Sequence, residues 1–126
     1  MTYDNFTIKA QESILKSQQI AAGLDQQQVD TVHLIKGILE TDESVAGFLL
    51  GKSEVNLDML RRKLDEAILK YPKVQGSDKQ FLTTDANKSL SRAKVLLKEF
   101  GDQYISVELM LLGIVQGDDS GAKLLK

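Results

Sequence analysis

The chain repeats one segment of its own sequence. Residues 6–22, FTIKAQESILKSQQIAA, align with residues 82–98, LTTDANKSLSRAKVLLK, at a shift of 76 positions. At this shift the matching pairs are Thr7 and Thr83, Ala10 and Ala86, and Ser13 and Ser89. One deletion then changes the shift to 75, at which Leu34 matches Leu109 and Leu49 matches Leu124. Such a duplication predicts a helical unit packed against its own copy. It also points away from a single catalytic site.

Each copy opens with small and apolar residues at helical spacing. Thr7 is a predicted N-cap, because its hydroxyl can accept a hydrogen bond from a free backbone N–H. The residues that follow recur at steps of 4, 3, 4 and 3, which places them on one helix face. The predicted buried stripes are Ala10, Ile14, Ser17, Ala21 and Leu24 in the first copy and Ala86, Leu90, Ala93, Leu97 and Phe100 in the second. The small residues would let neighbouring helices approach closely.

The same periodicity predicts the remaining helices. One covers residues 31–40, and its copy covers residues 106–116 with Leu109, Met110, Leu112 and Ile114 directed inward. A short helix follows TDES and ends at Gly51, which suits a C′ position. A further helix begins at Asn56 and stops before Pro72, because the proline ring cannot continue the helical hydrogen bonds.

No long run of alternating β-branched residues is present, so the predicted fold class is all-α. We expect one domain of two pseudo-repeated four-helix units. The first unit covers about residues 5–71, the linker about residues 72–80 and the second unit about residues 81–126. The second unit has counterparts for only three helices. We therefore expect its last helix to be missing or to lie beyond the end of the chain.

Composition excludes several classes of function. The net charge is −2 with no basic stripe, so an interaction with nucleic acid is not expected. The chain has no cysteine, which excludes disulfides and thiolate metal sites. No apolar run approaches the roughly 20 residues of a membrane span. The polar start, MTYDNFT, lacks the pattern of a signal peptide. We expect a cytoplasmic protein that does not contact a membrane.

The string GFLLGKS, residues 47–53, resembles a phosphate-binding loop only in part. That motif needs four residues between its glycines and a preceding strand, whereas three residues separate Gly47 from Gly51. A helix terminus followed by a solvated lysine explains the string better. A small nucleotide-binding enzyme stays open as an alternative that ATP binding by the chain would support.

His33 is the only histidine, and it lies near the start of a predicted helix. A zinc site needs about four ligands, and no second histidine or cysteine is nearby, so a packed or capping histidine is expected. With one histidine, no serine or threonine has a base and an orienting partner. We predict no enzyme activity, no metal and no cofactor in this domain. Asp118 and Asp119 are acidic helix-start signals.

The segment GDQYISVEL, residues 101–109, has two interpretations. Ser106 can cap the next helix, with Glu108 in its first turn and Asp102 in the turn before it. Capping accounts for these residues. The other interpretation is a polar rim around a binding groove.

Several segments together resemble a known family. FTIKAQESILKSQQIA, VHLI, YPKVQG and GDQYISVEL occur in the order and spacing seen in the N-terminal domain of ClpB-type protein disaggregases, which are AAA+ chaperones. The resemblance covers essentially the whole chain, and the doubled helical unit is a property of the Clp N-domain family. The segment from Pro72 to Gly76 is similar to the ClpB branch rather than to the protease-feeding branches.

The resemblance implies a substrate-recruiting module that precedes two ATPase modules. It would bind exposed hydrophobic segments of unfolded or aggregated polypeptides, here called clients. The parent homohexamer would then thread them through its pore, with ATP and Mg bound in its ATPase modules. An adaptor- or substrate-docking N-domain of a protease-associated Clp chaperone is the alternative. A protease-docking tripeptide loop in the downstream gene product would favour it.

The resemblance also implies site residues. Thr7, Asp102 and Glu108 match positions that matter for chaperone work in the family. Leu90, Leu96 and Leu109 match the walls of an apolar groove, although Leu90 and Leu109 could equally belong to the core. Arg92 stands where some relatives have an apolar residue. Burying one or two client side chains yields roughly 1.5–3 kcal/mol each before the cost of association, so we expect weak binding.

Overall fold

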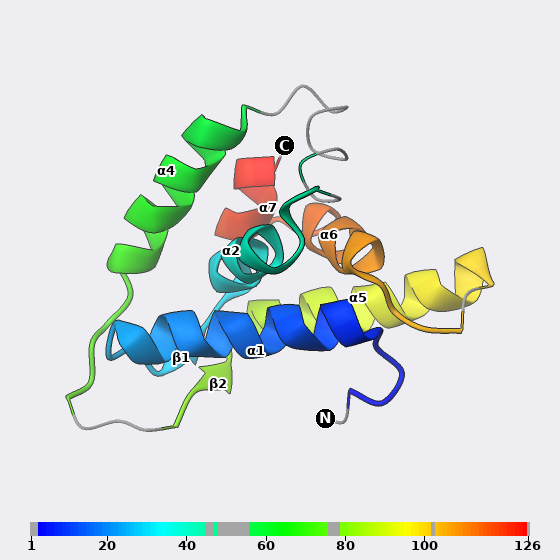
Figure 1. Ribbon diagram of the computed structural model, residues 1–126, viewed down its shortest axis with the longest axis horizontal. Coiled ribbons are helices and arrows are strands. Elements are labelled where there is room, and N and C mark those ends of the chain that lie inside the picture. The colour runs from blue at the N-terminus through cyan, green and yellow to red at the C-terminus, as the bar shows by residue number, and fades with distance from the viewer. Residues whose placement is uncertain (1–2, 45–46, 48–55, 76–78, 102, 126) are drawn as a thin grey trace.

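The computed structural model describes residues 3–44, 47, 56–75, 79–101 and 103–125, and its fold is all-α as predicted (Figure 1). The helices are α1 (Ile8–Gly23), α2 (Thr31–Thr41), α4 (Leu57–Leu69), α5 (Thr84–Phe100), α6 (Val107–Val115) and α7 (Ser120–Leu125). Two short strands, β1 (Gln28–Val29) and β2 (Phe81–Leu82), pair in parallel. Within the described part of the chain, no helix is long and apolar enough to cross a membrane. The predicted helix that ends at Gly51 lies outside the described residues.

Side-chain caps set the starts of α1, α4, α5 and α6. Thr7 Oγ1 accepts from Ala10 N at 3.1 Å, and Ser106 Oγ accepts from Leu109 N at 3.2 Å. The predicted caps Thr7 and Ser106 are thus confirmed, and Asn56 Oδ1 caps α4 in the same way, accepting from Met59 N at 3.0 Å. The fourth is Thr83 at the start of α5. Each cap satisfies a backbone N–H that has no partner inside its helix.

The helix pairs α1–α2 and α5–α6 meet at a glycine in each unit. A Cβ atom at Gly37 of α2 would lie 2.5 Å from the Ser13 carbonyl oxygen of α1. A Cβ atom at Gly113 of α6 would lie 2.5 Å from the Ser89 carbonyl oxygen of α5. The small residues of the two stripes therefore serve the close helix contact that the sequence predicts.

Equivalent residues of the two units are separated by the same number of positions throughout these helices. The N-caps Asp30 and Ser106 are 76 positions apart, as are Gly37 and Gly113. The expected deletion before the second helix is therefore wrong. In the structural register, the counterpart of Leu109 is His33, a pairing that matters for the site below.

The units exchange backbone contacts with each other. Val29, just before α2, pairs with Leu82, just before α5, and the Thr83 N–H donates to the Val29 carbonyl at 3.0 Å. The equivalent contact joins the segments before α1 and α6. Phe6 forms a parallel bridge with Ile105, and the Thr7 N–H donates to the Ile105 carbonyl at 2.9 Å. Each unit thus holds the start of the other unit's first helix.

Two predicted inward residues lie on the surface. Phe100 is 59% exposed, and it lies in the last turn of α5, which extends beyond the start of α6 (Figure 1). Leu112 is 42% exposed because the buried face of α6 runs through Met110, Leu111 and Ile114, and Leu112 points away from it. The remaining inward residues predicted for α6, Leu109, Met110 and Ile114, are buried.

Replacing Gly37 with alanine is expected to lower the free energy of unfolding by about 1–3 kcal/mol, because the methyl group would meet a backbone carbonyl that cannot move independently of α1. The same loss is expected for Gly113→Ala. Urea denaturation measures both. Gly23→Ala is the control, since a Cβ atom there meets nothing within 4 Å. A Gly37→Ala chain as stable as the control would contradict the close helix contact.

Candidate functional site

A buried polar network centred on Asp30 joins three parts of the chain. The Asp30 side chain is 8% exposed, and its Oδ1 accepts from Thr31 N at 2.8 Å and from Thr83 Oγ1 at 2.7 Å. Its Oδ2 accepts a short hydrogen bond from the Tyr71 hydroxyl. The carboxylate therefore links the start of α2 to the end of α4 and the start of α5. A buried charge with this many donors is satisfied without a counter-ion.

His33 belongs to the same network as a capping residue, as predicted. The Asp30 N–H donates to His33 Nδ1 at 3.0 Å, so the ring proton is on Nε2, which donates to Gln26 Oε1 at 2.8 Å. Gln26 Nε2 donates to the Ile68 carbonyl at 2.7 Å. Burial lowers the pKa of His33 to about 4, while the charge of Asp30 raises it and that of Lys36 lowers it. The imidazole is therefore neutral at pH 7.

Tyr71 is the second titratable partner of Asp30. Burial raises the pKa of its hydroxyl well above the ordinary value, and the hydrogen bond to Asp30 adds to the increase. Its ring also packs edge-on against the imidazole of His33, with centroids 5.2 Å apart. The hydroxyl therefore stays protonated and acts as a donor.

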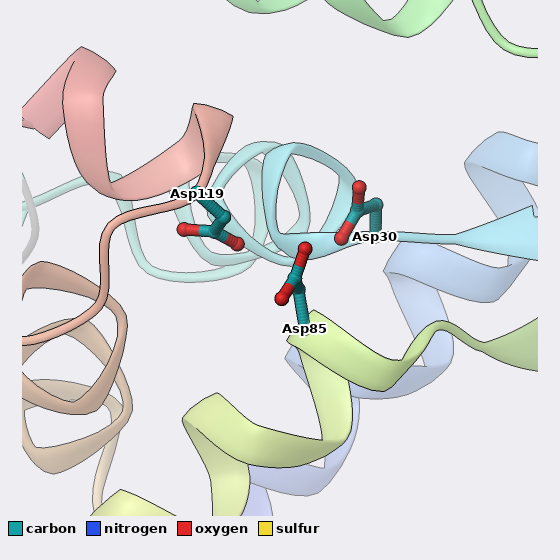
Figure 2. Close-up of side chains that lie close together, drawn as sticks. All are labelled: Asp30, Asp85 and Asp119. Carbon is teal, nitrogen blue, oxygen red and sulfur yellow. The ribbon is translucent and has the colours of Figure 1, made fainter.

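Three carboxylates converge beside this network (Figure 2). Oxygen atoms of Asp30, Asp85 and Asp119 lie within 4.8 Å of one another. Asp119 accepts from Thr31 Oγ1 at 2.6 Å and caps α7 through Ala122 N at 3.1 Å, so its predicted helix-start role is confirmed. Each carboxylate lies at the start of a helix, where the helix dipole favours negative charge. Capping and the dipoles account for the cluster without a bound cation.

The structure brings two of the predicted site residues to the same region. The backbone of Thr7 is hydrogen-bonded to Ile105, in the segment that leads into α6. Glu108 is half-exposed in the first turn of α6, where its charge is favourable. Asp102 lies outside the described residues. The start of α1, with Thr7, is therefore held next to the segment that leads into α6, with Glu108.

The three predicted groove leucines lie in the hydrophobic core. Leu90 is 1% exposed, Leu96 is 5% exposed and Leu109 is 4% exposed. All three pack between α5, α6 and their neighbours. For Leu90 and Leu109 the sequence allowed either a groove or a core position, and in the structure both side chains lie in the core. Their part in client binding stays a prediction.

Arg92 has a structural role that the sequence did not reveal. Its Nε donates to the Gly113 carbonyl at 2.6 Å, near the end of α6, where a cation is favoured. The Asp30 network was also missed. Its local signal was present, since Asp30 and His33 have capping-box spacing, but the bonds from Tyr71 and Thr83 span 41 and 53 residues.

The comparisons with known proteins agree on one family. The family model described as "Clp repeat (R) N-terminal domain" matches residues 5–126. The chain is 38% identical over 123 residues to "Chaperone protein ClpB 1" of Nostoc sp., a match that covers 98% of this chain and 14% of that protein. The chain thus spans about one-seventh of the length of this relative.

Solved structures show the same fold. The N-terminal domain of Hsp104 from Candida albicans superposes with a TM-score of 0.84 at 18% identity, over 96% of this chain and 79% of that one. The N-terminal domain of ClpD, a "Caseinolytic protease associated chaperone" from Arabidopsis thaliana, gives a TM-score of 0.76 at 25% identity, over 98% and 86% of the two chains.

The two capping threonines allow a test of the Asp30 network. Thr7→Val removes one cap and is expected to lower the free energy of unfolding by about 1 kcal/mol. Thr83→Val also removes a donor to a buried carboxylate, so the expected loss is about 2–3 kcal/mol. Thr83→Ser keeps the hydroxyl and is the control. Equal losses for the two valine variants in urea denaturation would show that the Asp30 contact contributes nothing.

His33 is expected to make stability depend on pH. Because its pKa is about 4 in the folded chain and 6.5 in the unfolded chain, the unfolded state takes up the proton first as the pH falls. The contribution of His33 to the free energy of unfolding is complete above pH 6.5 and decreases toward pH 4. Between pH 7 and pH 5.5, the free energy of unfolding should fall by about 1 kcal/mol.

Urea denaturation at these two pH values measures the effect. His33→Leu, which introduces the residue found at position 109, is the control. This variant should be less stable at both pH values, and its free energy of unfolding should change less between them. An unchanged slope in this variant would assign the pH dependence to other groups.

Proposed function

The chain belongs to the Clp N-terminal domain family, and on this premise we propose that it is the substrate-recruiting domain of an ATP-dependent ClpB-type disaggregase. In this role it binds exposed hydrophobic segments of unfolded or aggregated proteins. The observation that carries the proposal is the match to ClpB 1 over 98% of this chain. The domain itself is non-catalytic.

The parent protein supplies the chemistry in this proposal. The domain precedes the ATPase modules of a cytoplasmic homohexamer, which hold ATP and Mg and thread the client through the pore. The domain needs no cofactor for its own part. Non-directional apolar burial suits a client whose sequence varies. Burial of a few side chains gives weak binding, which suits transfer to a motor.

The buried leucines place a condition on this function. Thr7 and Glu108 are partly accessible, whereas Leu90, Leu96 and Leu109 are almost completely buried. A client can therefore reach the three leucines only if α5 and α6 move apart. The proposed site consists of a polar rim that includes Thr7 and Glu108 and an apolar groove that opens with the client; Asp102, outside the described residues, stays a predicted member of the rim.

The alternatives have less support. The N-terminal domain of ClpD, a protease-associated chaperone, has this fold, so an adaptor-docking domain stays an alternative, but the segment from Pro72 to Gly76 resembles the ClpB branch. The nucleotide-binding alternative rests on residues 47–53, and all of these except Gly47 lie outside the described residues. Nucleotide titration of the chain would decide that alternative.

An amide-shift titration with a reduced and alkylated, permanently unfolded polypeptide tests the proposal. We expect changes concentrated at Thr7, Asp102 and Glu108, and broadening at Leu90, Leu96 and Leu109 if the groove opens. A buffer-matched titration with a folded protein is the control. Changes confined to another face would contradict the site, and no change at all would contradict the function.

A further inference from the structure

The outer face of α1 has an apolar hollow. Its volume is about 350 Å³, and the residues that line it include the buried Ile14. Two aliphatic side chains on its sides are open to solvent, since Ile8 is 75% exposed and Leu15 is 54% exposed. They are seven positions apart, so they lie on one helix face at a separation of about 10 Å along the axis. A partner can therefore reach this surface without any movement of the helices.

Tyr3 also lines the hollow, beside the start of α1. Its ring packs edge-on against Phe6 with centroids 5.4 Å apart, and its carbonyl accepts from the Phe6 N–H at 3.0 Å. Phe6 is buried and bridged to Ile105. This end of the hollow is thus built on backbone that the second unit holds in place, next to the predicted site residue Thr7.

The duplication shows that the fold does not need an apolar outer face here. The counterparts of Ile8 and Leu15, 76 positions later on α5, are Thr84 and Ser91, and both are exposed. The buried stripes of α1 and α5 are small or apolar in both copies, so this difference is confined to the outer faces. Exposed apolar residues that packing does not require are typical of a binding surface.

The charges of α1 are already paired within the chain. Its three charged residues are Lys9, Glu12 and Lys16. Lys9 Nζ lies 3.9 Å from Glu12 Oε2, and Lys16 Nζ lies 3.7 Å from Glu40 Oε2. The hollow therefore lies on a helix face without net unpaired charge, and an uncharged apolar ligand suits it better than an ion.

The size of the hollow decides between a second copy of the chain and a short segment. A stable interface between two copies buries roughly 800 Å² per partner, and two aliphatic side chains supply only a small part of that area. Ligand sites, in contrast, begin at roughly 300 Å³. A hollow of about 350 Å³ therefore suits one or two apolar side chains of an extended polypeptide.

We propose that the face of α1 formed by Ile8 and Leu15 is the surface on which an apolar client segment docks while the domain is closed. Aliphatic side chains of the client enter the hollow. The amides of Gln11 and Gln18, which also line it, can bond to the peptide groups of the client. This inference rests on the proposed function, and it gives the client a contact that does not require α5 and α6 to move apart.

The minimal probe is a capped peptide, Gly-Leu-Gly-Leu-Gly, titrated into the 126-residue chain with labelled isoleucine and leucine methyl groups. We expect shifts at Ile8, Ile14 and Leu15, whereas Leu90 and Leu109 should not respond because they are buried. The capped peptide Gly-Ser-Gly-Ser-Gly is the control for the chemistry of the ligand and should produce no shifts.

The second unit supplies matched variants. Ile8→Thr combined with Leu15→Ser introduces the residues of α5, and should raise the dissociation constant of the leucine peptide about 10-fold or more. Val95→Gln is the control, because Val95 is 58% exposed on α5 and glutamine is its counterpart at position 19. Its affinity for the peptide should equal that of the parent chain. A reduced and alkylated polypeptide is then titrated into the same three chains and should give the same order of affinities.

Three outcomes would overturn the inference. The double variant could bind the leucine peptide as tightly as the parent chain, or the shifts could lie on another face. Shifts at Ile8 and Leu15 that depend on the concentration of the chain alone would identify a second copy as the occupant. If the unfolded polypeptide binds the double variant and the parent chain equally, only this inference fails. If it binds neither, the proposed function fails as well.

Discussion

The buried carboxylate of Asp30 is the interaction on which the arrangement of the helices depends. A charge removed from water is stable only when donors surround it, and the donors come from the start of α2, the end of α4 and the start of α5. Thr31 extends the same set of contacts to Asp119 at the start of α7. The hydrophobic core fills the space between the helices, but this polar cluster specifies which helix ends must meet.

The two units share a backbone plan and differ in the side chains placed on it. Each has a threonine cap, a glycine at the helix crossing and a left-handed turn after its first helix. At corresponding positions, however, the first unit has His33 and a polar network, whereas the second has Leu109 in an apolar core. The first unit also binds the linker, through the bridge between Gln26 and Lys73. The specialised contacts of the first unit thus serve assembly.

The helices and caps could be predicted because their signals are local. The stripes from Ala10 and from Ala86, the caps Thr7 and Ser106, the helix start at Asn56 and the stop before Pro72 follow from spacing and side-chain chemistry. The candidate site was less accessible. Whether Leu90 or Leu109 faces a groove or the core depends on packing between helices, which no local pattern encodes. The donors of Asp30 are 41 and 53 residues away, and the register of the second helix became clear only from Gly37 and Gly113.

The exchange of backbone pairs between the units has a consequence for synthesis of the protein. Phe6 pairs with Ile105, so Phe6 must wait for a residue that is far away in the sequence and is made later. Contacts between segments so distant in sequence are slow to form. The apolar stripe of α1 therefore emerges from the ribosome long before its final surroundings exist. Until then, we expect the nascent chain to expose hydrophobic surface that other proteins could bind.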